Sequence, residues 1–356
     1  MKLVVIPGDG IGPEITKATM HAVGALRQRF GFALEAQELD SGLAALKRRG
    51  VTVTDADIAT ARAADAVILG PMSVTLYPPP SEGGVNVPAL YRKALNLYAN
   101  IRPSYTRRGV PSVIRQMDIV FVRENVEDFY VDRNMHQGVG EFMPTPDVVL
   151  AVGKMTREGC ERIARAACEV ARGRPRRKLT IVHKAPVLKL YNGMFRDVAR
   201  EVAKGYADLE VEDLLVDAVA ALLVRTPERF DTILVPNMFG DILSDEASEL
   251  AGSLGLAASL NRGDDCSVAN AGHGSAPDIA GQGVANPSSL MLSTAMLFEH
   301  VGTKLGDDAV SQAGRCLRES VDAMLESPVT RTRDLGGSLG TQAFAEAVVS
   351  RISSST

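Results

Sequence analysis

The sequence has little of what several classes of protein require. Its four cysteines stand far apart with no C-x-x-C pair, so neither a zinc site nor a disulfide framework is indicated. A net charge of −4 and a pI near 5.8 argue against nucleic acid as a partner, because binding its phosphates requires a basic surface. No apolar run approaches the length of a membrane span. Scattered cysteines, and an opening that enters a strand without a signal-peptide pattern, predict a cytoplasmic location.

Short apolar runs alternate with longer helical patterns along the 356 residues. This alternation predicts an α/β fold in which helices cover a sheet, and the length allows two lobes. Strands are predicted at Lys2–Ile6, Ala66–Leu69, Ile119–Arg123, Leu179–His183 and Thr232–Pro236. Helices are predicted at Pro13–Phe30, Asp55–Ala63, Val87–Leu97, Arg157–Arg172, Gly193–Gly205, Asp241–Leu254, Ser288–Leu305, Asp307–Glu326 and Thr341–Arg351.

The segment Tyr130–Val152 lacks helical periodicity and alternates weakly. It is compatible with a β-hairpin arm that projects from the body and builds a dimer. A long surface loop explains the same residues equally well.

Asp241 and Asp245 are the most informative pair of residues. In a helix that begins near Phe239 they lie one turn apart on the same face, in its first turns. Two carboxylates held together repel each other, and a bound cation removes the repulsion. Oxygen ligands suit Mg²⁺ or Mn²⁺ better than zinc. The alternative, for an isolated pair, is a solvated helix face.

Three arginines stand in otherwise apolar or mixed segments: Arg92, Arg102 and Arg123. A charge at the end of a buried strand is normally paired or functional. Guanidinium groups bind carboxylates in bidentate fashion, so the three are candidates to hold a small di- or tricarboxylic acid. Surface salt bridges are the alternative.

Tyr130 and Lys184 are the candidates for proton transfer. Lys184 ends a predicted strand, and nearby metal and arginine charges would lower its pKa, which suits a general base. A lysine at the end of a strand is more often simply exposed to solvent.

Two glycine-rich segments predict close approach to a ligand. Pro7–Glu14 is a strand-to-helix turn whose G-x-G-x-G spacing differs from the Rossmann fingerprint. Gly272–Pro287 is a turn-rich loop able to wrap a nucleotide. Its acidic Asp278 is suited to a ribose diol and would repel a 2′-phosphate, which favours NAD over NADP.

Taken together, these segments resemble the β-decarboxylating dehydrogenases, the family of isocitrate, homoisocitrate, 3-isopropylmalate and tartrate/D-malate dehydrogenases. The resemblance covers nearly the whole chain. Its strongest parts are Leu97–Pro103, Arg123–Asn125, Asn237–Asp245 and His273–Pro287.

The resemblance implies a two-lobed, non-Rossmann α/β fold and a homodimer with shared active sites. The larger, dinucleotide-binding lobe would contain residues 1–98 and 250–356, and the smaller lobe, with the dimer interface, residues 99–249. By position it assigns substrate binding to Asn86, Arg92, Arg102 and Arg123, proton transfer to Tyr130 and Lys184, and metal ligation to Asp217, Asp241 and Asp245. Lys184 and Asp217 would come from the partner subunit. Dinucleotide binding is assigned to Ile11, His273, Gly274, Ser275, Ala276, Asp278, Ile279 and Asn286.

The implied reaction is NAD- and Mg²⁺- or Mn²⁺-dependent oxidative decarboxylation of a malate-type 2-hydroxy acid. The stretch Ser73–Tyr91 is expected to read the group on C3 of the substrate. Where isopropylmalate enzymes place two leucines, this chain has Pro88-Ala89, a poorer isopropyl pocket, so an isocitrate- or homoisocitrate-like acid is favoured. 3-Isopropylmalate, tartrate and D-malate remain alternatives, and a non-catalytic regulatory subunit is the alternative of another class.

Overall fold

The computed structural model describes residues 1–130, 135 and 138–354. The chain divides into two compact units. Unit 1 contains Met1–Leu95, Arg107–Ser112 and Gly252–Thr356, and unit 2 contains Asn96–Thr106 and Val113–Ala251. The predicted lobe boundaries lie within a few residues of these, apart from the short segment Arg107–Ser112. The dinucleotide and dimer roles given to the lobes stay predictions.

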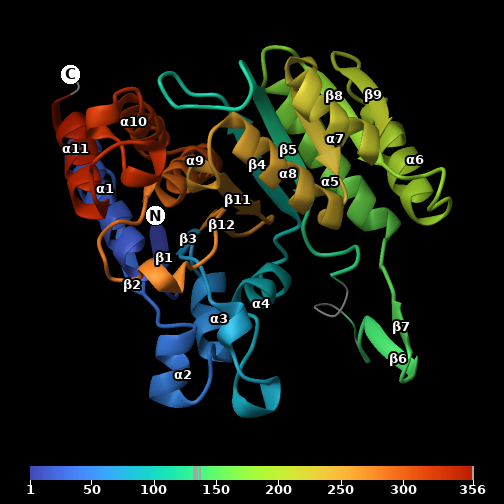
Figure 1. Cartoon of the computed structure of the whole chain (residues 1–356), viewed down its shortest axis with the longest axis horizontal. Coiled ribbons are helices and arrows are strands. Elements are labelled where there is room, and N and C mark those ends of the chain that lie inside the picture. The colour runs from blue at the N-terminus through green and yellow to red at the C-terminus, as the bar shows by residue number, and fades with distance from the viewer. Residues whose placement is uncertain (131–134, 136–137, 355–356) are drawn as a thin grey trace. The chain divides into compact units, whose positions relative to one another are not determined.

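Unit 1 is built on five strands in the order β2-β1-β3-β12-β11. All neighbours are parallel except β11 and β12. The strands are β1 (Lys2–Ile6), β2 (Glu35–Glu38), β3 (Ala66–Leu69), β11 (Ala258–Arg262) and β12 (Ser267–Ala271). The helices are α1 (Gly12–Phe30), α2 (Leu43–Arg49), α3 (Asp55–Arg62), α4 (Val87–Ala94), α9 (Ser288–Leu305), α10 (Asp308–Leu325) and α11 (Thr341–Ser354). Helix α9 packs on β11 and β12, and α1 and α10 pack beside it (Figure 1).

Unit 2 is built on the strand order β4-β5-β10-β8-β9, in which only β4 and β5 are antiparallel. The strands are β4 (Ala99–Tyr105), β5 (Asp118–Glu124), β8 (Lys178–His183), β9 (Glu210–Leu215) and β10 (Thr232–Val235). Helices α5 (Arg157–Arg172) and α6 (Tyr191–Ala203) share one apolar core with this sheet. Helices α7 (Val216–Arg225) and α8 (Asn237–Ala251) share a second core with it. The sheet therefore lies between two helical layers.

Sequence periodicity explains how these helices pack. Helix α5 buries Cys160, Ile163, Ala164, Ala167 and Ala171, which recur at the spacing of one helical face. Most of these side chains are small, so the helix can approach the sheet closely. The hydroxyl of Thr156 caps the helix by accepting the Gly159 N–H, which satisfies one of the unpaired donors of its first turn.

The segment 138–152 contains a β-hairpin, β6 (Glu141–Thr145) paired antiparallel with β7 (Val148–Ala151). The hairpin extends away from the other elements of unit 2 (Figure 1). Its large apolar side chains, including Phe142, Val149 and Leu150, are exposed. The predicted hairpin is confirmed within the described residues, whereas residues 131–134, 136 and 137 lie outside them. Its part in a dimer stays a prediction.

Hydrophobic periodicity in the sequence does not predict several of these strands and helices. Strand β2 is an exposed edge with the sequence Glu-Ala-Gln-Glu, which has no apolar alternation. Strand β4 carries Asn100 and Ser104, which are buried. These polar residues interrupt the apolar run by which a buried strand is recognised in a sequence. Helix α7 follows β9 with no intervening turn, which leaves no boundary signal. Among the described residues, none of the helices is long and apolar enough to span a membrane.

Candidate active site

The predicted arginines and aspartates of unit 2 form one cluster, with Arg102 in the middle of β4, Arg123 near the end of β5, and Asp241 and Asp245 in the second and third turns of α8. Arg102 Nη1 donates to Asp245 Oδ1 at 3.0 Å and to the Ser244 hydroxyl at 2.9 Å. It also lies 3.3 Å from Asp241 Oδ1. Arg123 Nη1 donates to the same Asp241 oxygen. The tertiary fold thus brings Arg102, Arg123, Asp241 and Asp245 together from three separate elements.

Arg123 is the most buried charge of the cluster. It is 1% exposed, and its Nε and Nη2 donate to Asn237 Oδ1 at 3.0 and 2.6 Å. Burial, together with the charge of Arg102, lowers the pKa of Arg123 to about 10, so the group stays charged at neutral pH. A Cβ at Gly240 would lie 2.7 Å from the Arg123 side chain, so only glycine leaves room for it.

Tyr130 joins this cluster through its hydroxyl. The hydroxyl donates to Asp241 Oδ2 at 3.0 Å, and the Arg123 guanidinium lies 5.7 Å from the centre of the tyrosine ring. The predicted proton donor is therefore within hydrogen-bond reach of the predicted metal ligand.

The helix that carries both aspartates begins earlier than predicted. Helix α8 starts at Asn237, and its first turn contains no acidic residue. The expectation that the N-terminal end of the helix dipole stabilises Asp241 and Asp245 is therefore wrong. The arginines of β4 and β5 neutralise the pair instead. Burial raises the pKa of Asp245, and the nearby Asp241 adds to the rise.

The oxygen-rich character of Asp241 and Asp245 fits a hard divalent ion. The two lie one helical turn apart, and their side chains are 37% and 45% exposed. Within the described residues, no group of three or more Asp, Glu, His or Cys side chains is placed to hold a metal. One chain therefore supplies two carboxylates at this point, and a further protein ligand would have to come from elsewhere.

Lys184 and Asp217 form a separate pair in unit 2. Lys184 follows β8, and its ammonium donates to Asp217 in the first turn of α7. This hydrogen bond is the main cause of the lowered pKa of Asp217. The Asp217 side chain is 63% exposed, so the pair faces outward and is accessible to another molecule.

In unit 1 the glycine turn and the glycine-rich loop lie against each other. The Ile11 N–H donates to the Ser275 carbonyl at 2.8 Å. The Gly283 N–H donates to Glu14 Oε2 at 3.2 Å. The other oxygen of Glu14 is buried and has no hydrogen-bond partner in the part of the chain that the structure describes. Two segments that are far apart in the sequence thus lie side by side.

The loop itself carries groups with unused bonding capacity. Burial lowers the pKa of His273. Its buried Nε2 has no partner among the described residues, while Nδ1 contacts the Gly274 carbonyl. Asp278 is exposed on a short 3-10 turn. Asn286 is different, because its amide donates to Asp334 and its carbonyl accepts the Ser288 N–H. It therefore shapes the loop with both of its polar atoms.

The predicted substrate residues Asn86 and Arg92 lie on unit 1. Asn86 caps α4, since its Oδ1 accepts the Ala89 N–H at 3.1 Å. Arg92 lies on the same helix, one and a half turns further on. These two residues belong to a different unit from Arg102 and Arg123.

Three residues of the cluster were missed from the sequence: Asn100, Asn237 and Ser244. Asn100 Oδ1 accepts Arg102 Nε at 2.8 Å, and Asn237 orients Arg123. A signal did exist for Asn237, because it stands two residues after the buried parallel strand β10, and ligand-binding groups commonly gather at the carboxyl ends of such strands. Nothing in the periodicity marks Asn100 or Ser244.

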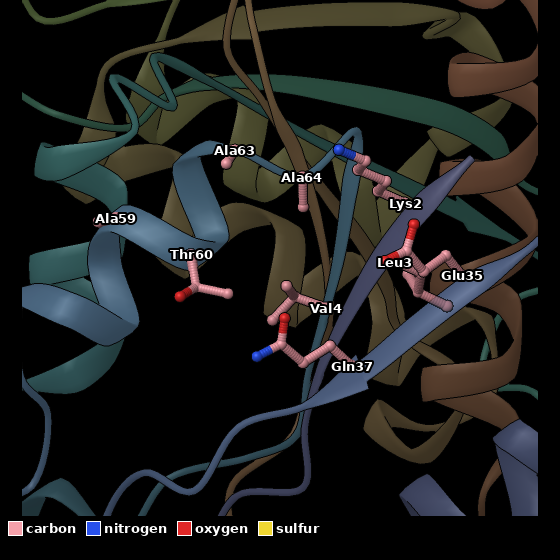
Figure 2. Close-up of a pocket in the computed structure, with 9 residues that line it drawn as sticks. All are labelled: Lys2, Leu3, Val4, Glu35, Gln37, Ala59, Thr60, Ala63 and Ala64. Atoms are coloured by element: carbon pink, nitrogen blue, oxygen red, sulfur yellow. The ribbon is translucent and has the colours of Figure 1, made fainter.

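A cavity of about 420 Å³ opens at the β1–β2 edge of unit 1 (Figure 2). Its lining includes Lys2, Glu35, Gln37 and Thr60. It contains none of the predicted site residues. Lys2 and Glu35 are register partners on neighbouring strands, so their opposite charges are explained by the sheet itself.

Comparison with known proteins places this chemistry in a family. Residues 2–348 match the family model described as isocitrate/isopropylmalate dehydrogenase. The chain is 40% identical to the isocitrate/homoisocitrate dehydrogenase of Thermus thermophilus, over 99% of each chain. It is 39% identical to the 3-isopropylmalate dehydrogenase of Archaeoglobus fulgidus, over 98% of each. The crystal structure of isocitrate dehydrogenase from Methylococcus capsulatus superimposes with a TM-score of 0.87 at 37% identity, covering 99% of both chains.

The α/β fold, the arginine–aspartate cluster and these likenesses agree. The chain belongs to the isocitrate/isopropylmalate dehydrogenase family and is an oxidative decarboxylating dehydrogenase, an oxidoreductase that acts on CH–OH donors.

Proposed function

We propose that the chain uses NAD and Mg²⁺ or Mn²⁺ to oxidise the hydroxyl of a malate-type 2-hydroxy acid and to release its β-carboxylate as CO₂. The acid carries a polar C3 substituent, as in isocitrate or homoisocitrate. The observation that carries this proposal is the placement of Arg102 and Arg123 against Asp241 and Asp245. Guanidinium groups that can bind the carboxylates of the acid thus lie next to carboxylates that can bind a metal ion.

The arginines would hold the carboxylates of the substrate. Arg102 is 11% exposed at its side chain, and its Nη1 contacts both aspartates. A guanidinium in this position can direct two N–H donors toward a substrate carboxylate while it remains in the site. Arg123 is held by Asn237 and therefore offers a rigid charge. Arg92, on α4, is the third arginine that the family resemblance assigns to the substrate.

Asp241 and Asp245, with the partner subunit's Asp217, would hold the divalent ion. When bound there, the ion supplies Lewis-acid polarisation of the substrate oxygen and stabilises negative charge that develops during decarboxylation. Tyr130, whose hydroxyl points at Asp241, would deliver the proton that the product needs at carbon. Lys184 of the partner subunit would accept the proton of the substrate hydroxyl. Its pairing with Asp217 keeps these two groups together on one surface.

NAD would bind at the loop of unit 1. The buried, unpartnered Nε2 of His273 and the exposed carboxylate of Asp278 suit an adenosine moiety and its ribose diol. A carboxylate at that position disfavours a 2′-phosphate, which supports NAD over NADP.

The substrate preference rests on α4. Ala89 is buried at 5% exposure, and Pro88 lies one turn before Arg92 on the same face. Neither residue offers the large apolar surface that an isopropyl group would need. Relatives of almost equal identity are named for isocitrate/homoisocitrate, homoisocitrate and 3-isopropylmalate. 3-Isopropylmalate, tartrate and D-malate are therefore the alternatives to be assayed.

A homodimer with shared sites is the proposed assembly. Unit 2 exposes large apolar side chains: Leu190, just before α6, is 89% exposed, Ile242 of α8 61% and Val224 of α7 55%. Exposed apolar surface of this kind commonly marks a protein interface. The four cysteines are free, which agrees with a cytoplasmic location.

Assay of the purified chain with NAD, Mn²⁺ and each acid in turn tests the reaction and ranks the substrates. Turnover of 3-isopropylmalate far above the others would overturn the substrate preference. Turnover by the chain alone would exclude a non-catalytic regulatory subunit. Absence of turnover with every acid would favour it.

Mixing two inactive variants tests the shared site. In a symmetric dimer of Asp241→Asn with Asp217→Asn subunits, one site keeps both native aspartates and the other has neither. Random exchange of equal amounts should restore about one quarter of the native activity. If both ligands came from one chain, the mixture would stay as inactive as its components.

A further inference from the structure

Unit 1 contains a buried carboxylate, Asp9, that the proposed reaction does not use. It lies in the glycine turn and is 4% exposed. Its Oδ1 accepts the Leu43 N–H at 2.7 Å, and its Oδ2 accepts the Ser73 N–H at 2.9 Å and the Tyr77 hydroxyl at 2.6 Å. Each donor belongs to a segment other than the turn. Asp9 therefore connects the turn to the start of α2 and to the first residues of the substrate-reading loop, Ser73–Tyr91.

The far part of the substrate-reading loop is attached to the same network. The Val85 N–H donates to Thr52 Oγ1 at 3.0 Å, and the Thr52 N–H donates to the Gly83 carbonyl at 3.0 Å. The Thr52 carbonyl accepts the Gly42 N–H at 2.8 Å, and Gly42 directly precedes Leu43. Two separate stretches of the loop are thus held by hydrogen bonds that lead back to Asp9.

The third segment in contact with this network is the cofactor loop, Gly272–Pro287. The Ser73 hydroxyl donates to the Ser275 hydroxyl at 2.8 Å, and both side chains are buried. A Cβ at Gly10 would lie 2.0 Å from the Ser275 carbonyl oxygen. The cofactor loop therefore contacts both the turn and the substrate-reading loop at Ser275.

We propose that Asp9 is a positioning residue that couples the substrate-reading loop to the cofactor loop, so that the hydroxy acid and the dinucleotide each strengthen the binding of the other. This inference rests on the proposed function. The physical reason is that both loops are held by the same hydrogen bonds, so a ligand that stabilises one loop in its binding position also stabilises the other. The coupling must be reciprocal, because it is a property of the two binding equilibria.

Tyr77→Phe is the most conservative way to weaken the network. It removes the hydroxyl that donates to Asp9 and keeps the ring. Burial and the Asp9 carboxylate raise the pKa of Tyr77, so the native phenol remains a donor at neutral pH. Asp9→Asn removes the charge on which all three donors converge and should act in the same direction more strongly. Tyr206→Phe, a half-buried tyrosine of unit 2, is the matched control.

The experiment measures the dissociation constant of NADH by fluorescence, with Mn²⁺ present, in the absence and presence of a saturating hydroxy acid. NADH and the hydroxy acid are both reduced, so no turnover occurs. We expect the acid to tighten NADH binding at least about fivefold in the native protein and in Tyr206→Phe. In Tyr77→Phe the tightening should fall below about twofold, with NADH affinity in the absence of acid nearly unchanged.

If the Tyr77 hydroxyl had a purely structural role, Tyr77→Phe would lower the melting temperature, or would weaken NADH binding equally without and with the acid. The ratio of the two NADH dissociation constants would then be unchanged. Native coupling that survives in Tyr77→Phe, or a native protein with no coupling, would overturn the inference while turnover still supports the proposed function. A native protein that neither binds NADH nor oxidises any of the acids would overturn both. If Asp9→Asn fails to fold, Tyr77→Phe still decides the question.

Discussion

Replacing Arg123 with lysine tests the central cluster most directly. The native guanidinium makes three N–H hydrogen bonds, two to Asn237 Oδ1 and one to Asp241 Oδ1. A single ammonium group can replace only one of these with comparable geometry. Since a hydrogen bond to a charged group contributes about 1.5–3 kcal/mol, the loss of two should lower the free energy of unfolding by at least about 3 kcal/mol.

That loss should be visible both in stability and in catalysis. The melting temperature of Arg123→Lys should fall by roughly 6–12 °C, at about 2–4 °C per kcal/mol. If the guanidinium also binds a substrate carboxylate with two N–H groups, lysine loses one of those bonds, which contributes about 1.5–3 kcal/mol. The value of kcat/KM should then fall about tenfold or more, because each 1.36 kcal/mol corresponds to a factor of ten. Calorimetry and steady-state assays with the preferred acid measure the two effects.

Arg165→Lys is the matched control. Arg165 is 53% exposed and lies 3.8 Å from Glu161, and an exposed pair of this kind contributes about 0–1 kcal/mol. A melting temperature for Arg123→Lys no lower than that of the control would refute the argument. A second check is the double variant with Asn237→Ala, whose effect should be smaller than the sum of the two single effects because both changes remove the same contacts.

Four further changes test other parts of the structure. Burial raises the pKa of Glu124 to about 7 from 4.5, so between these values the folded protein keeps a proton that the unfolded chain loses. The free energy of unfolding should therefore fall as the pH rises from 4.5 to about 7. In Glu124→Gln the urea midpoint should not show this fall. Asp231→Asn should cost about 3 kcal/mol in urea unfolding, because Asp231 is fully buried against Arg174. Asp241→Asn should abolish tight Mn²⁺ binding, read by electron paramagnetic resonance without any turnover. Tyr130→Phe should lower kcat about 100-fold or more with NADH affinity unchanged, and a kcat within threefold of native would remove Tyr130 from the proton transfer.

The chemical character of the site was readable from local sequence. Pairs such as Asp241 and Asp245 lie within one helical turn, so their common face follows from helix geometry alone. The predicted bounds of the buried strands Lys2–Ile6 and Ala66–Leu69 are those of the structure. Each strand is a short apolar run between turn residues, so its ends can be recognised from the local sequence alone. The glycine spacing of Pro7–Glu14 likewise indicated close backbone approach.

Other features depend on residues that meet only after folding. Asn237, at the start of α8, acts through Arg123 of β5, and Asp9 acts through Tyr77 and Leu43. Strand β4 was missed because its buried Asn100 and Ser104 find polar partners elsewhere in the fold. A hydrogen bond between distant segments leaves no periodic trace in either of them. The sequence by itself therefore determined which reactive groups this protein carries, and only the tertiary structure decided which of them share a site and which residues hold them there.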